Sequence, residues 1–136
     1  MKAKIFSGLF LVFTFVISSP MEAHHGYASY DMTQTMTLTG TVTEFMLANP
    51  HSSLSFDVNA GKTEVQHWSM EFGYVRILKD AGWTKDTLKA GDQITAVFHP
   101  AKNGARVGAL SKLMNADGKE IPLSPPPSKE SGNGPQ

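Results

Sequence analysis

The sequence contains no cysteine. This absence excludes disulfide bonds, thiolate metal ligands, a cysteine nucleophile and a lipidated cysteine anchor. A folded domain in this chain must therefore be held together by its hydrophobic core alone. The side chains left to coordinate a metal ion are those of His, Asp, Glu and Met.

The sequence also lacks an excess of positive charge. It carries 12 basic and 12 acidic residues, and no stretch concentrates the lysines and arginines. Proteins that bind nucleic acid gather positive charge on one face. We therefore expect no nucleic-acid partner.

The N-terminal apolar run is too short to span a membrane. It covers residues 5–17, whereas a spanning helix needs ~20 residues. Lys2 and Lys4 precede the run and Ala23 ends the polar segment after it, a pattern typical of a cleavable secretory signal. We expect residues 1–23 to be removed, with cleavage after Ser18 as the alternative. The product would be a periplasmic or secreted protein with no stable membrane anchor.

Familiar catalytic motifs are absent as well. The sequence has no Gly-x-Ser-x-Gly elbow, no phosphate-binding loop and no His-Glu-x-x-His helix. Glu71 and Asp57 could serve as acid or base, but isolated acids on small domains are usually surface charges. We assign no catalytic residue, and a binding module is favoured over an enzyme.

Alternation of apolar and polar residues is the main structural signal. It predicts five strands, at residues 36–43, 53–58, 63–70, 94–99 and 107–114. Gly40 inside the first of these predicts a bend or a bulge. Helical spacing of apolar residues predicts one helix over residues 72–81, with Gly82 at its C-terminal cap.

The resulting order is β-β-β-α-β-β, which is the order of a small OB-like Greek-key barrel. A different small β-barrel or an α+β roll has nearly the same pattern. We expect one mainly β domain over residues 24–123. The tail at residues 124–136 is rich in Pro, Ser and Gly, which predicts disorder.

Several short motifs resemble those of an uncharacterised family of exported bacterial proteins. They are His24-His25-Gly26, Leu38-Thr39-Gly40-Thr41-Val42, Asn49-Pro50-His51, Ala81-Gly82-Trp83, Leu88-Lys89-Ala90-Gly91-Asp92 and His99-Pro100-Ala101-Lys102-Asn103-Gly104. The resemblance spans residues 24 to about 121, and it implies export and a single domain but no activity. The family's usual residue after His-His is Ser, and Gly26 in its place predicts a more flexible N-terminus.

The five histidines are the most distinctive chemical feature. If cleavage follows Ala23, the free amine and the ring of His24 could chelate one metal ion, with His25 or a distant histidine adding another nitrogen. Such ligands suit Cu²⁺ first and Zn²⁺ next, and an N-terminal amine titrates near ~8. His51 and His99 each lie beside a proline at a strand end, so they are the best remote ligands.

Each histidine also has a structural interpretation. An N-terminal pair is often mobile and solvated, and His51 and His99 suit turn residues that hydrogen-bond to the backbone. Alternation places His67 on the strand face opposite Trp68, as a surface or cross-strand histidine. Trp68 and Trp83 are predicted to be core or barrel-closing aromatics.

Three functions remain open from the sequence. The first is an exported binding module that carries copper or zinc, or that assists a larger exported protein. The second is a copper oxidoreductase with a histidine brace built from His24 and either His51 or His99. The third is an OB-like domain that binds a glycan or another small ligand, with Tyr27 and Tyr30 as the loose aromatics.

Overall fold

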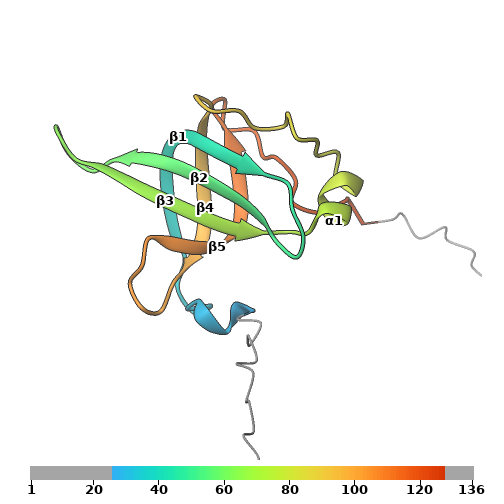
Figure 1. Ribbon diagram of the computed structural model, residues 1–136, viewed down its shortest axis with the longest axis horizontal. Helices are drawn as coiled ribbons and strands as arrows, with labels where there is room; N and C mark the ends of the chain where they lie inside the picture. Colours follow the sequence, from blue (N-terminus) through green and yellow to red (C-terminus); the bar gives the residue numbers. More distant parts are fainter. Residues whose placement is uncertain (1–25, 128–136) are drawn as a thin grey trace, which may run out of the picture.

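The computed structural model describes residues 26–127 (Figure 1). Residues 1–25 and 128–136 lie outside this range, so the predicted signal peptide, His24, His25 and most of the predicted disordered tail are not described. The elements in chain order are η1 (Tyr27–Ser29), β1 (Met36–Met46), β2 (Ser52–Asn59), β3 (Val65–Phe72), α1 (Val75–Asp80), β4 (Gln93–Pro100) and β5 (Val107–Asn115).

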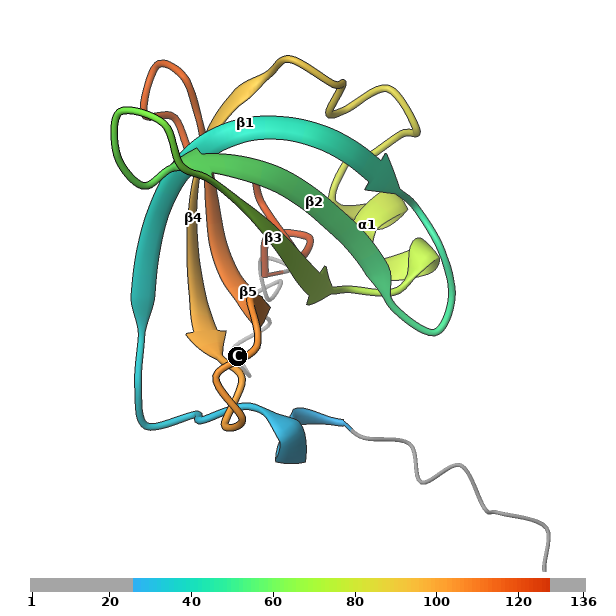
Figure 2. The same ribbon diagram turned by 60° about the vertical axis from the view of Figure 1, so that its left-hand side comes forward.

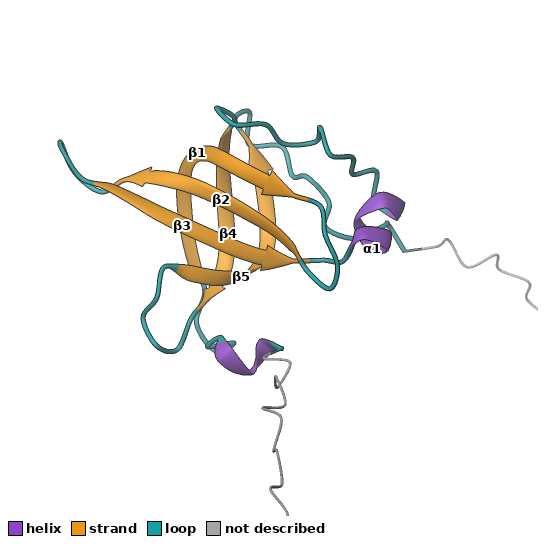
Figure 3. Ribbon diagram, viewed as in Figure 1, coloured by secondary structure: helices purple, strands orange, loops and turns teal. Residues whose placement is uncertain are grey.

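The strands form a closed barrel in the order β1-β2-β3-β5-β4. β3 and β5 pair in parallel, whereas every other neighbouring pair is antiparallel. α1 connects β3 to β4 and lies at one end of the barrel (Figure 3). The mainly β, OB-like barrel predicted from the sequence is confirmed, because both the element order and the closure match that fold.

β1 bends sharply and pairs with two neighbouring strands (Figure 2). Its first half pairs with β4 and its second half pairs with β2. The sequence predicts a bend or a bulge at Gly40: β1 is bent, and the register shift lies further along the strand, between Val42 and Glu44. Gly40 instead allows close approach of two strands: a Cβ there would collide with the backbone oxygen of Asp57 and the ring of Phe56.

The inward-facing residues of the five strands fill the barrel. Phe56, Phe98 and Met70 are fully buried there. The two tryptophans occupy the predicted core positions, since Trp83 is only 2% exposed and the Trp68 ring packs 5.4 Å from that of Phe98. A single core of this kind replaces the missing disulfides.

The helix is shorter than predicted. It runs over Val75–Asp80, not over residues 72–81, because Phe72 completes β3 by pairing with Ser52 and faces the core. Tertiary pairing thus overrides the helical spacing of this segment. Gly82 follows the helix with φ of 95°, a conformation that glycine adopts without steric cost and that ends a helix as expected.

The chain after β5 folds back over the end of the barrel that carries α1. The backbone N–H of Ile121 donates to the carbonyl of Leu113, and Nε1 of Trp83 donates to the carbonyl of Pro122 at 2.6 Å. Residues 124–127 are exposed. Within the described part of the chain, neither helix is long and apolar enough to cross a membrane.

Residues 26–31, here called the N-terminal strap, cross the outside of the barrel below β4 and β5 (Figure 1). The Asp31 N–H donates to the carbonyl of Pro100 at 2.8 Å, and the Lys102 N–H donates to the carbonyl of Ser29 at 3.0 Å. Tyr30 forms a β-bridge with Ala101. These contacts fix the strap, and with it the point at which the preceding residues enter the fold.

Candidate functional site

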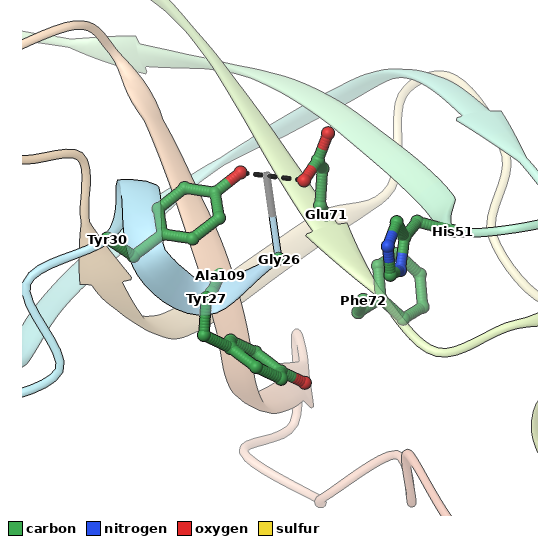
Figure 4. Close-up of a pocket in the computed structure, with 7 residues that line it drawn as sticks. All are labelled: Gly26, Tyr27, Tyr30, His51, Glu71, Phe72 and Ala109. Carbon is green, nitrogen blue, oxygen red and sulfur yellow. Dashed lines mark hydrogen bonds between the residues drawn. The ribbon is translucent and has the colours of Figure 1, made fainter. Parts of the chain in front are cut away.

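The strap, β3, β5 and the loop before β2 border a small, half-open cavity of about 30 Å³, here called the His51 cavity (Figure 4). Its lining residues are Gly26, Tyr27, Tyr30, His51, Glu71, Phe72 and Ala109. Figure 4 shows Glu71 between Tyr30 and His51, with Gly26 beside them. A space of this size accommodates a water molecule or a metal ion.

His51 is held by the residues on either side of it. Asn49 accepts a hydrogen bond from the backbone N–H of Val75 at 3.0 Å, which caps α1. The fully buried hydroxyl of Ser52 donates to the carbonyl of Ala48. Within residues 26–127 the side chain of His51 itself makes no hydrogen bond, and it is exposed. The two neighbours therefore shape the loop and leave the His51 imidazole available.

Glu71 belongs to the outer face of β3. It alternates with Met70 and Phe72, which point into the core. The Tyr30 hydroxyl donates to Oε2 of Glu71 at 2.8 Å. Burial raises the pKa of Tyr30 above its ordinary value, and the hydrogen bond and the charge of Glu71 raise it further. The phenol therefore stays a donor at neutral pH and holds the carboxylate against the strap.

His99 does not line this cavity. It is paired with Ala109, which is paired in turn with Glu71, so two strand spacings, roughly 10 Å, separate His99 from Glu71. Nδ1 of His99 lies 2.7 Å from the carbonyl oxygen of Gln34. Because a carbonyl oxygen only accepts, Nδ1 is the donor. His99 thus has the backbone contact that the structural interpretation expects.

His67 is the cross-strand histidine that alternation predicts. It is exposed, and its Nδ1 lies within hydrogen-bond distance of the Asp57 carboxylate directly opposite on β2. The sequence predicts Tyr30 to be a loose aromatic residue that could contact a ligand. This prediction is wrong, because Tyr30 is only 7% exposed. Tyr27 is 68% exposed, as a loose aromatic should be.

No three His, Asp or Glu side chains between residues 26 and 127 are close enough together to hold a metal ion. His51 and Glu71 are brought together, but His99 is not with them. Sequence reasoning treated Glu71 only as an isolated acid and missed its pairing with Tyr30. That pairing spans 41 residues, so no local pattern reports it.

The fold and the cavity define a class of protein, a small OB-type barrel with one histidine and one carboxylate on its outer surface beside the N-terminal strap. The chain belongs to a family of unknown function (DUF6152), whose model matches residues 14–111. No curated protein matches the chain.

Among solved structures, the chain is similar to the mitochondrial single-stranded DNA-binding protein Rim1 from S. cerevisiae. The sequence identity is 8% and the TM-score is 0.49, over 61% of this chain and 93% of that chain. The DNA-binding function belongs to that protein and is not transferred to this chain.

Proposed function

We propose that the protein is exported and that it binds a copper or zinc ion through its N-terminal histidines and His51. The observation that supports this proposal is the lining of the His51 cavity: Gly26, the residue that follows His24 and His25, lines the same small space as His51 and Glu71. The described residues alone supply too few ligands. His24 and His25 directly precede Gly26 in the sequence and would complete the set.

Chain geometry allows this convergence. Consecutive Cα atoms are 3.8 Å apart, so the Cα atom of His25 must lie within ~3.8 Å of that of Gly26 and the Cα atom of His24 within ~7.6 Å. An imidazole nitrogen binds a metal ion at ~2.0–2.1 Å, so an ion held by these histidines would lie within one side-chain length of their Cα atoms. The flexibility of Gly26 assists this approach.

The ligand chemistry favours copper. The His24 amine and ring would form one chelate, and the His51 ring would add a third nitrogen. Imidazole and amine ligands bind Cu²⁺ more tightly than the other divalent first-row metals, with Zn²⁺ as the next candidate. Glu71 would offer an oxygen ligand, because Tyr30 occupies only its Oε2 atom. His99 is left out of this set because it lies outside the cavity.

The role that we propose is binding, as a metal carrier or as an accessory to a larger exported protein. A copper oxidoreductase is the second candidate, since the same nitrogen set would form a histidine brace around His24. It requires an open coordination position and redox turnover. Reduction of bound Cu²⁺ by ascorbate with continued oxygen consumption would separate this enzyme from a carrier.

The test is a calorimetric titration of Cu²⁺ and Zn²⁺ into protein that begins at His24 and retains all described residues. Two matched proteins accompany it: one that keeps Ala23, which converts the His24 amine into an amide, and one with His51→Ala. His67→Ala is the control, because His67 is an exposed histidine distant from the cavity. We expect one-to-one binding that Ala23 and His51→Ala each weaken at least tenfold, roughly 1.4 kcal/mol.

Binding that is equally weak in all four proteins would rule out the metal proposal. Tight binding that depends on His51 but not on the free amine would retain a metal site and reject the chelate at His24. Tight binding that His67→Ala weakens as much as His51→Ala would place the ion elsewhere on the barrel.

A further inference from the structure

A second, larger cavity lies next to the His51 cavity. Its volume is about 300 Å³, and it is here called the apolar groove. The two cavities share Tyr27, His51 and Phe72, so the groove begins where the His51 cavity ends. Its other walls come from the start of α1, from β5 and from Leu123 after β5. Of the residues that line the groove, the proposed metal site uses His51 alone.

Two exposed aromatic rings border the groove. Tyr27 is 68% exposed and Tyr74 is 49% exposed, although the first belongs to the strap and the second precedes α1. Phe72, Ile77 and Leu110 form the apolar surface with them. Tyrosine rings stack on flat apolar groups, and their hydroxyls can hydrogen-bond. Rings from distant parts of the chain that border one cavity favour a ligand over mere surface exposure.

The part of the groove that residues 26–127 form carries no permanent charge. Among these residues no Asp, Glu, Lys or Arg lines it, and His51 is the one histidine that does. The Ser111 hydroxyl donates to the carbonyl of Val97 and is already used. A charged ligand would lose hydration here without gaining an opposite charge, which is costly. The lining therefore selects against ions and leaves His51 and two phenols for polar contacts.

The volume limits the ligand further. Small-molecule sites usually measure about 300–1,000 Å³, so this groove lies at the lower limit and holds a molecule of one or two rings. We infer that the apolar groove binds a small, neutral, aromatic molecule whose one polar group points toward His51. This site does not require a metal ion. If one is bound in the His51 cavity, the polar end of the ligand lies beside it.

The experiment uses metal-free protein, residues 24–136, in the presence of EDTA, so that failure of the metal proposal does not affect the outcome. Amide NMR spectra are recorded during titration with p-cresol, 4-methylbenzoate, 4-methylbenzylamine and methyl glucoside. These probes compare a neutral ring with an anionic, a cationic and a sugar ring. We expect p-cresol to bind with a dissociation constant of ~1 mM or below and to shift the Gly73 and Ser111 signals. The two charged probes should bind at least tenfold more weakly.

Three variants sharpen the test. Tyr74→Ala removes one wall and should weaken p-cresol binding severalfold, whereas Val65→Ala, another exposed apolar residue far along the β2–β3 hairpin, should not. Leu123→Lys introduces a positive charge at the groove and should reverse the preference toward 4-methylbenzoate. Thermal melting monitored by circular dichroism checks that each variant is folded.

The absence of saturable shifts at Gly73 and Ser111 with p-cresol would overturn the inference. So would equal binding of the neutral and charged probes. Preferential binding of methyl glucoside would replace the aromatic ligand with a sugar. If the calorimetric titration shows no binding of copper or zinc but p-cresol still binds, the proposed metal site is rejected and the ligand site in the apolar groove is supported.

Discussion

The hydroxyl of Tyr30 donates a 2.8 Å hydrogen bond to Oε2 of Glu71 and thereby joins the N-terminal strap to β3. This bond holds the strap, which begins at Gly26, on the side of the barrel where Gly26, His51 and Glu71 line one cavity. The backbone bonds of Asp31 to Pro100 and of Lys102 to Ser29 lie on either side of Tyr30 and fix the same segment. Preorganisation of the proposed metal site therefore depends on a tyrosine that need not touch the ion.

Replacing Tyr30 with Phe removes this hydrogen bond and keeps the ring. Because the bond is part-buried and its acceptor is charged, we expect the free energy of unfolding to fall by about 1–2 kcal/mol. Loss of a partner that orients a metal ligand typically lowers affinity roughly tenfold or more. Urea denaturation and copper calorimetry measure the two effects. Tyr74→Phe, which removes an exposed hydroxyl, is the control, and equal behaviour of the two variants would contradict this role.

The raised pKa of Tyr30 predicts how stability depends on pH. The folded state favours the protonated phenol more than the unfolded state does. The stabilisation is therefore complete below the ordinary tyrosine pKa of ~10 and is lost as the pH rises above it toward the folded-state pKa. Denaturation between pH 8 and 11 should show a decline at the alkaline end that is shallower in Tyr30→Phe. Identical profiles in the two proteins would contradict the assignment.

The barrel could be predicted from the sequence because its signals are local. Alternation at Leu54, Phe56 and Val58 indicates one buried strand face, and a single helix between the third and fourth strands favours the OB order. The helix start was predicted wrongly because Phe72 suits both a strand and a helix face. Its pairing with Ser52 across the sheet decides between them.

The candidate site could be predicted only in part. The Asn-Pro-His element identified His51, since a histidine beside a strand end is conspicuous in the sequence. His99 has the same local pattern, yet its ring is used in a bond to Gln34. The difference comes from the strap and β3, which meet at His51. Contacts between segments so far apart in the chain leave no periodic signal.

Gly40 is a position where a single methyl group should be costly. A Cβ there would collide with the backbone carbonyl of Asp57 and with the fully buried ring of Phe56. We expect Gly40→Ala to lower the free energy of unfolding by about 1–3 kcal/mol, the usual cost of overpacking. Gly61→Ala is the matched control, because nothing lies within 4 Å of its Cβ position. Equal stability of the two variants, measured by urea denaturation, would refute the close approach.

Within the Asn-Pro-His element, we expect Asn49 to stabilise the fold and His51 to bind the metal ion. Asn49→Ala removes the cap of the Val75 N–H, so it should lower the free energy of unfolding by about 1 kcal/mol, which is typical of a lost helix cap. Its effect on copper affinity should be small. His51→Ala should do the opposite, with a change in stability of about 0.5 kcal/mol or less and a large loss of copper affinity. The contrast follows because Asn49 holds the loop whereas the His51 ring faces the cavity.

Both proteins are compared by urea denaturation without metal and by copper calorimetry under identical conditions. The metal-free measurement is essential, because a bound ion stabilises the folded state by mass action and would hide the difference. A large loss of metal-free stability in His51→Ala would show that the imidazole supports the fold and would weaken its assignment as a ligand. Unchanged stability in Asn49→Ala would mean that α1 does not depend on its cap. Opposite effects of the two substitutions would assign separate roles to residues only two positions apart.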